Sequence, residues 1–321
     1  MPSLMRKLPA FLVALVALVA VSCNTNDGPV DPGTTPNAPT SLQAQSRSET
    51  AVALQWNASA SGVSPSGYRV LYNVKSSAVT DSITVTGATS TTAVVTGLTF
   101  GVIYEFSVKA LNGSTASVAS GSIEWAPAKR SGILKLYSGF NPAEGSGLVV
   151  FENAPAVASI NQGRLWDLAF DDVTDPSRPH IASPGQTAYV NNSFEFSNGQ
   201  VAKTVYLGRQ YTNISSLDEI WETTDLDDDS LNKEKFYDLS SIGGTGSFGF
   251  VFASRAQSGI FTYGKALVIR TNNTFIQGSG TNKYIEVQVS YQTNPSIPYA
   301  LRAKMEATAL NRAGEINVNA R

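Results

Sequence analysis

Residues 51–56 read Ala51-Val52-Ala53-Leu54-Gln55-Trp56. Every second side chain from Val52 to Trp56 is large and apolar, so these side chains fall on one face of an extended strand. The same alternation recurs in residues 68–72 and 104–108. A period of two in short segments predicts β-strands that pack together through their apolar faces.

Short segments of this kind follow one another through the first part of the chain. Strand candidates lie at residues 41–44, 51–56, 68–72, 82–85, 93–95, 102–108 and 121–124. About seven short strands in about ninety residues is the count of a β-sandwich. We therefore predict a sandwich domain over residues 37–128.

This segment resembles the fibronectin type III family at several points along its length. Ala38-Pro39-Thr40-Ser41-Leu42 opens it, Trp56 ends the second strand, and Gly67-Tyr68-Arg69-Val70 begins the third. Residues 97–104, Gly97-Leu98-Thr99-Phe100-Gly101-Val102-Ile103-Tyr104, are similar to the family's leucine and tyrosine-corner segment. The resemblance implies an immunoglobulin-like, Greek-key sandwich.

The resemblance also implies structural roles for two aromatic residues. Trp56 would lie in the core, and the hydroxyl of Tyr104 would return to the backbone near Leu98. Exposed aromatic rings could instead stack on a ligand, but the alternation with apolar neighbours favours core packing. Such a sandwich commonly serves as a spacer or interaction module, so we assign this domain to presentation of the next one.

After residue 130 the strand candidates become longer and more widely spaced. They lie at residues 132–137, 147–151, 165–170, 201–206, 249–252, 266–270, 284–291 and 301–307. Strands and helices do not alternate, and the only helix candidate is at 217–221, which favours a mostly antiparallel sheet. The chain is therefore predicted to be all-β, with a larger, mostly antiparallel β domain over residues 131–321.

This second domain carries another resemblance. Arg164-Leu165-Trp166-Asp167-Leu168-Ala169-Phe170 is similar to the Trp-Asp-(Ile/Leu)-Ala-Phe strand of the HmuY-like haem-binding lipoproteins. Residues 266–271 and 283–291 resemble the late pair of strands in that family, in the same order. The resemblance implies a ligand-binding β domain and makes Trp166 a candidate ligand-binding residue.

Haem capture in that family uses paired histidines as axial ligands. This chain has one histidine, His180, which follows Pro179 in a predicted loop. A two-histidine site within one chain is therefore excluded. His180 could ligate alone or with Met305, but a solvated loop residue is the favoured interpretation. We therefore predict that the domain keeps the fold of this family but has changed or lost its ligand. Haem stays a candidate cofactor.

The amino terminus resembles a bacterial lipoprotein signal. Arg6 and Lys7 precede the apolar run 8–21, and Ser22 precedes the only cysteine, Cys23. We predict a signal peptide over 1–22, lipidation at Cys23, and a Pro/Gly-rich tether over 23–36. Because Ala20 replaces the usual leucine of the lipobox, plain secretion or a retained anchor helix are the alternatives. Lipidation would place the protein in the bacterial cell envelope, at the outer membrane or cell surface.

Composition restricts the partners. The chain has 321 residues, a formal net charge of −2 and no long basic block, which argues against nucleic acid. A single cysteine excludes an internal disulfide. The expected partners are the membrane, through the lipid, and an extracellular or periplasmic ligand.

Two acidic groups are candidate cation sites. Asp225, Asp227 and Asp229 place carboxylates at alternate positions, as calcium loops do, but the turn glycine and final glutamate of that motif are missing. Calcium is therefore an alternative to a solvated acidic loop. Asp167, Asp171, Asp172 and Asp175 form a second group, for which we expect exposed loop charges.

Catalysis finds little support in the sequence. No nucleophile elbow, zinc spacing or phosphate loop is present, and the Gly-rich residues 243–249 lack the lysine of a phosphate loop and are interpreted as a mobile hairpin. We expect a binding protein rather than an enzyme. The leading hypothesis is a lipid-anchored, HmuY-like ligand-binding protein, and the alternative is a structural or adhesive surface lipoprotein that recognises glycans.

Overall fold

The computed structural model describes residues 35–59, 61–141, 143–152, 154–158, 166–173, 175–183, 203–221, 236–255 and 261–295. Over these ranges every strand pair is antiparallel, which confirms the all-β fold class. None of the helices in them has the length and hydropathy needed to span a bilayer. The predictions for Cys23, Asp225, Asp227, Asp229, Met305 and the strand at 301–307 lie outside the described residues.

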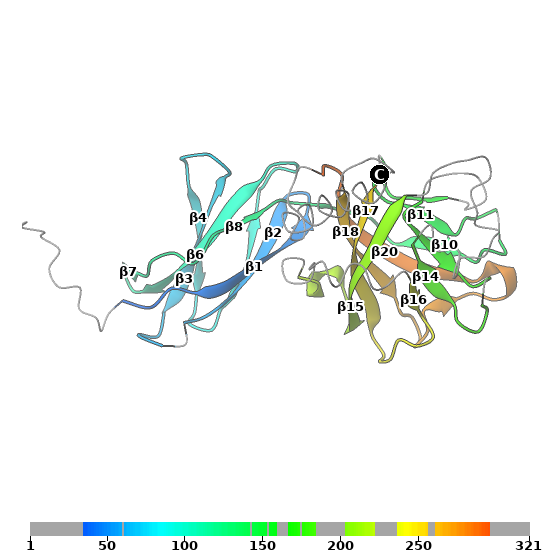
Figure 1. The fold of residues 1–321 in the computed structure, drawn as a ribbon. Coiled ribbons are helices and arrows are strands. Elements are labelled where there is room, and N and C mark those ends of the chain that lie inside the picture. Colours follow the sequence, from blue (N-terminus) through cyan, green and yellow to red (C-terminus); the bar gives the residue numbers. More distant parts are fainter. Residues whose placement is uncertain are drawn as a thin grey trace, which may run out of the picture.

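The first sandwich consists of two sheets (Figure 1). One has the strand order β1-β2-β5, and the other has the order β4-β3-β6-β7, with β8 also paired to β6. The strands are β1 (Thr40–Ser48), β2 (Ala51–Asn57), β3 (Gly67–Val74), β4 (Asp81–Thr86), β5 (Thr92–Thr96), β6 (Tyr104–Asn112), β7 (Thr115–Ala116) and β8 (Ile123–Trp125).

The core of this sandwich comes from the alternating apolar residues. Val52 and Leu54 are fully buried, and Trp56 is 1% exposed with its ring centroid 5.3 Å from that of Tyr68. The core position predicted for Trp56 is confirmed. The Tyr104 hydroxyl accepts a hydrogen bond from the backbone N–H of Thr99 at 3.0 Å, which confirms the predicted return of this hydroxyl to the backbone beside Leu98.

In the structure, the second domain comprises the strands β9 to β20. One sheet has the order β10-β20-β18-β17-β15, with β9 and β19 also paired to β20, and the other has the order β12-β11-β13-β14-β16. The strands are β9 (Lys129–Arg130), β10 (Leu134–Tyr137), β11 (Gly147–Val149), β12 (Ala156–Ala158), β13 (Leu168–Asp171), β14 (His180–Ala182), β15 (Thr204–Ile214), β16 (Phe236–Asp238), β17 (Ser247–Arg255), β18 (Thr262–Ile269), β19 (Ile276–Gln277) and β20 (Tyr284–Gln292).

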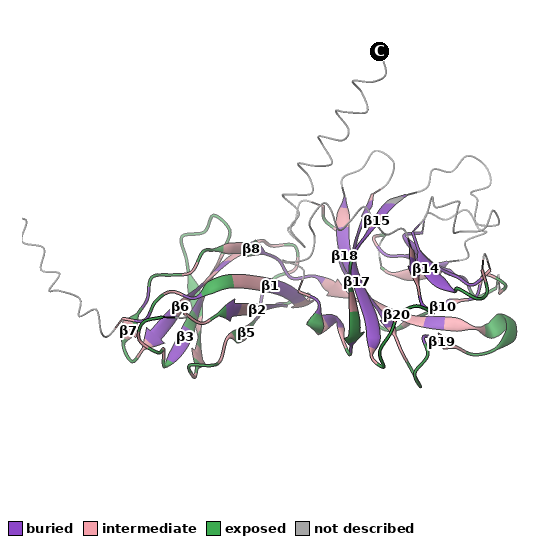
Figure 2. Ribbon diagram, turned by 60° about the horizontal axis from the view of Figure 1, so that its bottom comes forward, coloured by how far each residue is buried: buried purple, intermediate pink, exposed green. Residues whose placement is uncertain are grey.

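Strand β17 is buried on both faces, as the continuous purple ribbon in Figure 2 shows. Phe248, Phe250 and Phe252 point into the core shared with the other sheet of the second domain. Val251 and Ala253 belong instead to the apolar cluster that contains the core of the first sandwich. Because side chains alternate along a strand, one face of β17 packs in the core of the second domain and the other face packs in the cluster that includes the first sandwich.

The helix predicted at 217–221 is a single 3₁₀ turn, η3 (Leu217–Glu219). The hydroxyl of Ser216 accepts a hydrogen bond from the Asp218 N–H and caps this turn. Gly249 leaves room for it: a Cβ there would lie 2.6 Å from the Cδ1 atom of Ile220. The turn is therefore seated against β17.

Candidate functional site

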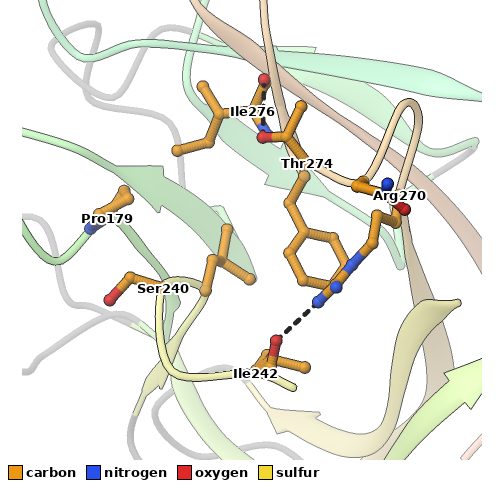
Figure 3. A pocket seen from close by; sticks show the side chains of 9 residues that line it. Pro179, Ser240, Ile242, Arg270, Thr274 and Ile276 are labelled. Atoms are coloured by element: carbon orange, nitrogen blue, oxygen red, sulfur yellow. Dashed lines mark hydrogen bonds between the residues drawn. The ribbon is translucent and has the colours of Figure 1, made fainter. Parts of the chain in front are cut away.

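A pocket of about 380 Å³ opens on the second domain (Figure 3). It lies between the turn after β16, the turn after β18, and the residue before β14. The lining residues are Pro179, Leu239, Ser240, Ile242, Arg270, Asn273, Thr274, Phe275 and Ile276.

A tight turn holds one rim of the pocket. Thr271 and Thr274 exchange two backbone hydrogen bonds, of 2.9 and 3.1 Å. Between them, Asn272 and Asn273 have φ angles of 51° and 63°, as expected for the two central residues of a type I′ turn. Asparagine tolerates this left-handed conformation better than most residues, so the Asn-Asn pair explains why the chain turns here.

Arg270 joins this turn to the opposite wall. Its guanidinium lies 4.2 Å from the centroid of the Phe275 ring, an attractive cation–π geometry. Nη2 donates to the carbonyl oxygen of Ile242 at 2.7 Å, and Nη1 donates to the carbonyl oxygen of Gly244. Arg270 thus fixes the shape of the pocket through the Gly-rich turn that precedes β17.

The pocket combines an apolar base with a polar rim. Leu239 and Phe275 are nearly fully buried, whereas Ser240 and Asn273 are exposed at the surface. None of the 9 lining residues carries a carboxylate, an imidazole or a thiol. This arrangement can hold a small polar ligand, and the two hydroxyls in its lining already donate hydrogen bonds within the protein, that of Ser240 to Oδ1 of Asp238 at 2.6 Å and that of Thr274 to the Ile276 carbonyl at 3.1 Å.

His180 lies in strand β14 and is 3% exposed, so the prediction of a solvated loop residue is wrong. Its Nδ1 atom faces the carbonyl oxygen of Arg178, which can only accept, so Nδ1 is the donor. Nε2 lies 3.7 Å from Oδ2 of Asp171, and the ring packs 4.9 Å from that of Phe236. The neighbouring Pro179 lines the pocket, whereas His180 is not among the lining residues.

Trp166 also lies in the interior. It is 1% exposed and packs in a small cluster with Val149, Ala169 and Ala182. The structure therefore does not bring Trp166 and His180 together at a surface where a ligand binds. Ligand binding by these two residues stays a prediction from the sequence.

The acidic residue after Trp166 is the centre of a buried polar network. Asp167 is fully buried, and its Oδ2 atom accepts from Lys203 Nζ at 3.1 Å and from the Val150 N–H at 2.7 Å. Its Oδ1 atom accepts from the Ser254 hydroxyl. Burial raises the pKa of Asp167, although the charge of Lys203 and these hydrogen bonds act in the opposite direction.

The expectation of exposed charges in this acidic group is wrong for three of its members. Asp167, Asp171 and Asp172 are buried, and Asp172 accepts a hydrogen bond from the Ser138 hydroxyl at 2.8 Å. Asp175 is half-buried, and hydrogen bonds from Ser177 lower its pKa. Among the described residues, no group of three or more His, Cys, Asp and Glu side chains is arranged to hold a metal ion.

Comparison with known proteins bears on the first sandwich. The family model of the fibronectin type III domain matches residues 37–126. Residues 37–126 are a fibronectin type III domain.

A curated relative and several solved structures are similar to parts of the chain. Chitinase Chi52 of Paenibacillus xylanexedens is 40% identical over 89 residues, which make up 27% of this chain and 16% of that enzyme. The third fibronectin III domain of human KIAA0343 protein is 20% identical, with a TM-score of 0.30 over 34% of this chain and 95% of that one. The FN5 domain of Drosophila Lar is also 20% identical, with a TM-score of 0.25 over 29% and 97%.

The fibronectin type III domain contributes no residue to the pocket. Sequence reasoning missed the pocket because its lining comes from three separate turns, which no single motif marks. The Thr-Asn-Asn-Thr sequence at 271–274 was the available signal, since two adjacent asparagines between strand candidates are typical of a hairpin turn.

Proposed function

We propose that this protein is a lipid-anchored protein of the cell envelope, in which the fibronectin type III domain holds a ligand-binding β domain away from the membrane. One observation carries the proposal. Strand β1 begins at Thr40, at the end of the fibronectin domain that faces away from the second domain (Figure 1). The chain passes into the second domain near Arg130, at the opposite end.

This geometry separates attachment from binding. A tether over 23–36 that starts at a lipidated Cys23 would join the fibronectin domain at its free end. The nine residues of β1 span about 30 Å, at about 3.3 Å per residue. The second domain would therefore stand at least that far from the end of the tether, accessible to ligands from solution.

The anchoring test compares the wild-type protein with Cys23→Ala. We expect labelled fatty acid to be incorporated into the wild type alone, and the variant to be released from the membrane fraction. Equal labelling of both proteins, or equal membrane association, contradicts the anchor.

The ligand-binding role is supported by the pocket and by the HmuY-like segments of the second domain. The volume of the pocket, about 380 Å³, lies within the range of small-molecule sites. Haem is not the ligand that the geometry favours, because His180 is buried and its Nε2 atom, the nitrogen left to bind iron, faces Oδ2 of Asp171 at 3.7 Å. We expect a small polar ligand in place of haem.

Titration with haem checks this distinction. We expect weak binding by the full chain, without the spectrum of a six-coordinate, low-spin complex, and the same result for His180→Ala. Tight binding with that spectrum, abolished by His180→Ala, would show that His180 becomes an axial ligand and that the haem hypothesis is correct.

An adhesive, glycan-binding role is the second candidate, favoured by the 40% identity with a segment of a chitinase. In this case the polar rim of the pocket would contact sugar hydroxyls. We expect retention on insoluble chitin, and loss of retention in Asn273→Ala. Thr84→Ala, an exposed substitution on strand β4, is the matched control and should bind like the wild type. Absence of wild-type retention rejects chitin as the ligand.

A further inference from the structure

We infer that Asp218 locks the fibronectin type III domain and the second domain into one rigid unit, and that loss of its charge converts the connection between them into a hinge. The inference rests on the contacts of η3, which projects from the second domain onto strand β1. It concerns a mechanical property that is independent of which ligand the pocket takes.

Apolar contacts bring the two domains together. Leu217 and Ile220, on either side of Asp218, are fully buried in the same cluster as the core residues of the fibronectin domain. Tyr263 and Leu267, from the outer face of β18, belong to it as well. Apolar burial is not directional, so it favours contact without fixing one orientation.

The contacts of Asp218 fix the orientation of the two domains relative to each other. Its Oδ1 atom pairs with Arg130 Nη2 at 2.5 Å, and its Oδ2 atom pairs with Arg47 Nη1. Its backbone carbonyl accepts from Nε2 of Gln45 at 2.8 Å. One residue of the second domain is thus held by two residues of β1 and by the first strand after the fibronectin domain. Hydrogen bonds to charged groups are among the strongest and most directional contacts available.

A buried lysine makes this carboxylate necessary. Lys265 on β18 is fully buried, and its Nζ atom donates to the Ile220 carbonyl at 3.1 Å and to Oε1 of Gln45 at 3.3 Å. Burial acts to raise the pKa of Asp218, but the hydrogen bond and charge of Arg130 and the charges of Arg47 and Lys265 lower it overall. Arg47, Arg130 and Lys265 therefore gather around one carboxylate. Without that negative charge, Arg47 of the fibronectin domain would face Arg130 and Lys265 of the second domain with like charge.

The connecting segment is itself tied down. The Ala128 N–H donates to the Ser48 carbonyl at 3.2 Å, and Gln292 Nε2 donates to the Pro127 carbonyl at 3.0 Å. Strand β9 then pairs with β20. These contacts occupy the backbone that a hinge would have to free, so the connection is rigid while the lock is closed.

The test measures the distribution of distances between the two domains in the full chain. Spin labels are attached at Thr84→Cys and Thr281→Cys, two exposed positions, in the Cys23→Ala background. We expect one narrow distance distribution for the otherwise unchanged protein. Asp218→Asn keeps the shape of the side chain and removes its charge, and should lose the single narrow distribution in favour of a broad one.

Two further variants complete the design. Asp81→Asn removes the same charge from the exposed face of β4 and should keep the narrow distribution. Arg47→Met removes the ion pair between β1 and Asp218 but leaves the Gln45 hydrogen bond to Asp218 and the Arg130 hydrogen bond to the Ser46 carbonyl, so an intermediate width is expected. This variant tests the lock if Asp218→Asn does not fold. A broad distribution before substitution, or unchanged widths in both interface variants, overturns the lock.

Discussion

The two domains differ in the kinds of side chain that they bury in their cores. Among the buried residues that the structure describes in the fibronectin type III domain, the polar ones are Gln45, Ser46 and Ser117, and none of these carries a charge. The second domain buries several ionisable side chains, namely Asp167, Asp171, Asp172, His180, Lys203 and Lys265. The first core is therefore specified by shape and apolar area, whereas the second also depends on partners for charges that burial would otherwise make costly.

The largest effect is expected from breaking a buried charge pair in the second domain. Asp167→Asn removes the buried counter-charge of the Lys203 ammonium and leaves it only the exposed carboxylate of Glu152 at 3.5 Å, so it should lower the free energy of unfolding by about 3–5 kcal/mol. Denaturant unfolding of the full chain measures this change. In a matched double variant, Lys203→Met added to Asp167→Asn should restore much of the loss, since neither partner then carries a buried charge.

A small cost for the single variant would contradict this account. If Asp167→Asn alone unfolds within about 0.5 kcal/mol of the wild type, the range of ordinary surface substitutions, then Glu152, 3.5 Å from Lys203, or water compensates the lysine charge in solution. The second domain would then resemble the first in relying on apolar packing.

The same difference explains how much of the molecule could be predicted from sequence. The fibronectin domain could be predicted because Trp56 and Tyr104 alternate with large apolar residues, a pattern that predicts strands with one buried face. In the second domain, Asp167 and Asp171 look like surface residues until their partners are known. Lys203 is 36 residues from Asp167 in the chain, so their pairing is decided by tertiary structure. The pocket was unpredictable for the same reason.

Removing a large buried ring of the fibronectin domain should lower the free energy of unfolding by a similar amount through a different mechanism. Trp56→Ala creates a cavity between the two sheets and should lower the free energy of unfolding by about 3–5 kcal/mol. Val94→Ala is the control, because Val94 is 48% exposed and should change little. An unchanged melting midpoint for Trp56→Ala would show an exposed ring and reopen a binding role for it.

Acid should weaken the contact between the domains. Burial acts to raise the pKa of Asp218, but the hydrogen bond and charge of Arg130, with the charges of Arg47 and Lys265, lower it overall. A lowered pKa means that the stabilisation is present above the ordinary value of 3.8 and is lost as the pH falls through the value in the folded protein. The distance distribution should broaden in that acidic range, and Asp218→Asn, already broad, should change less. Equal broadening of both proteins would assign the effect to other carboxyl groups.

The smallest change in stability is expected from removing one hydrogen bond in the fibronectin domain, the bond between Thr99 and Tyr104. Tyr104→Phe removes the hydroxyl that accepts from the Thr99 N–H and leaves the ring in the core, so the free energy of unfolding should fall by about 0.5–1.5 kcal/mol. Tyr72→Phe removes a hydroxyl from the adjacent strand β3 and should cost less than about 0.5 kcal/mol, as an ordinary partly exposed position does. Because both changes delete the same atom, the difference between them reports the tyrosine-corner bond alone. Equal costs would mean that water replaces Tyr104 as the partner of Thr99, and that the fibronectin domain needs no buried polar contact at this corner.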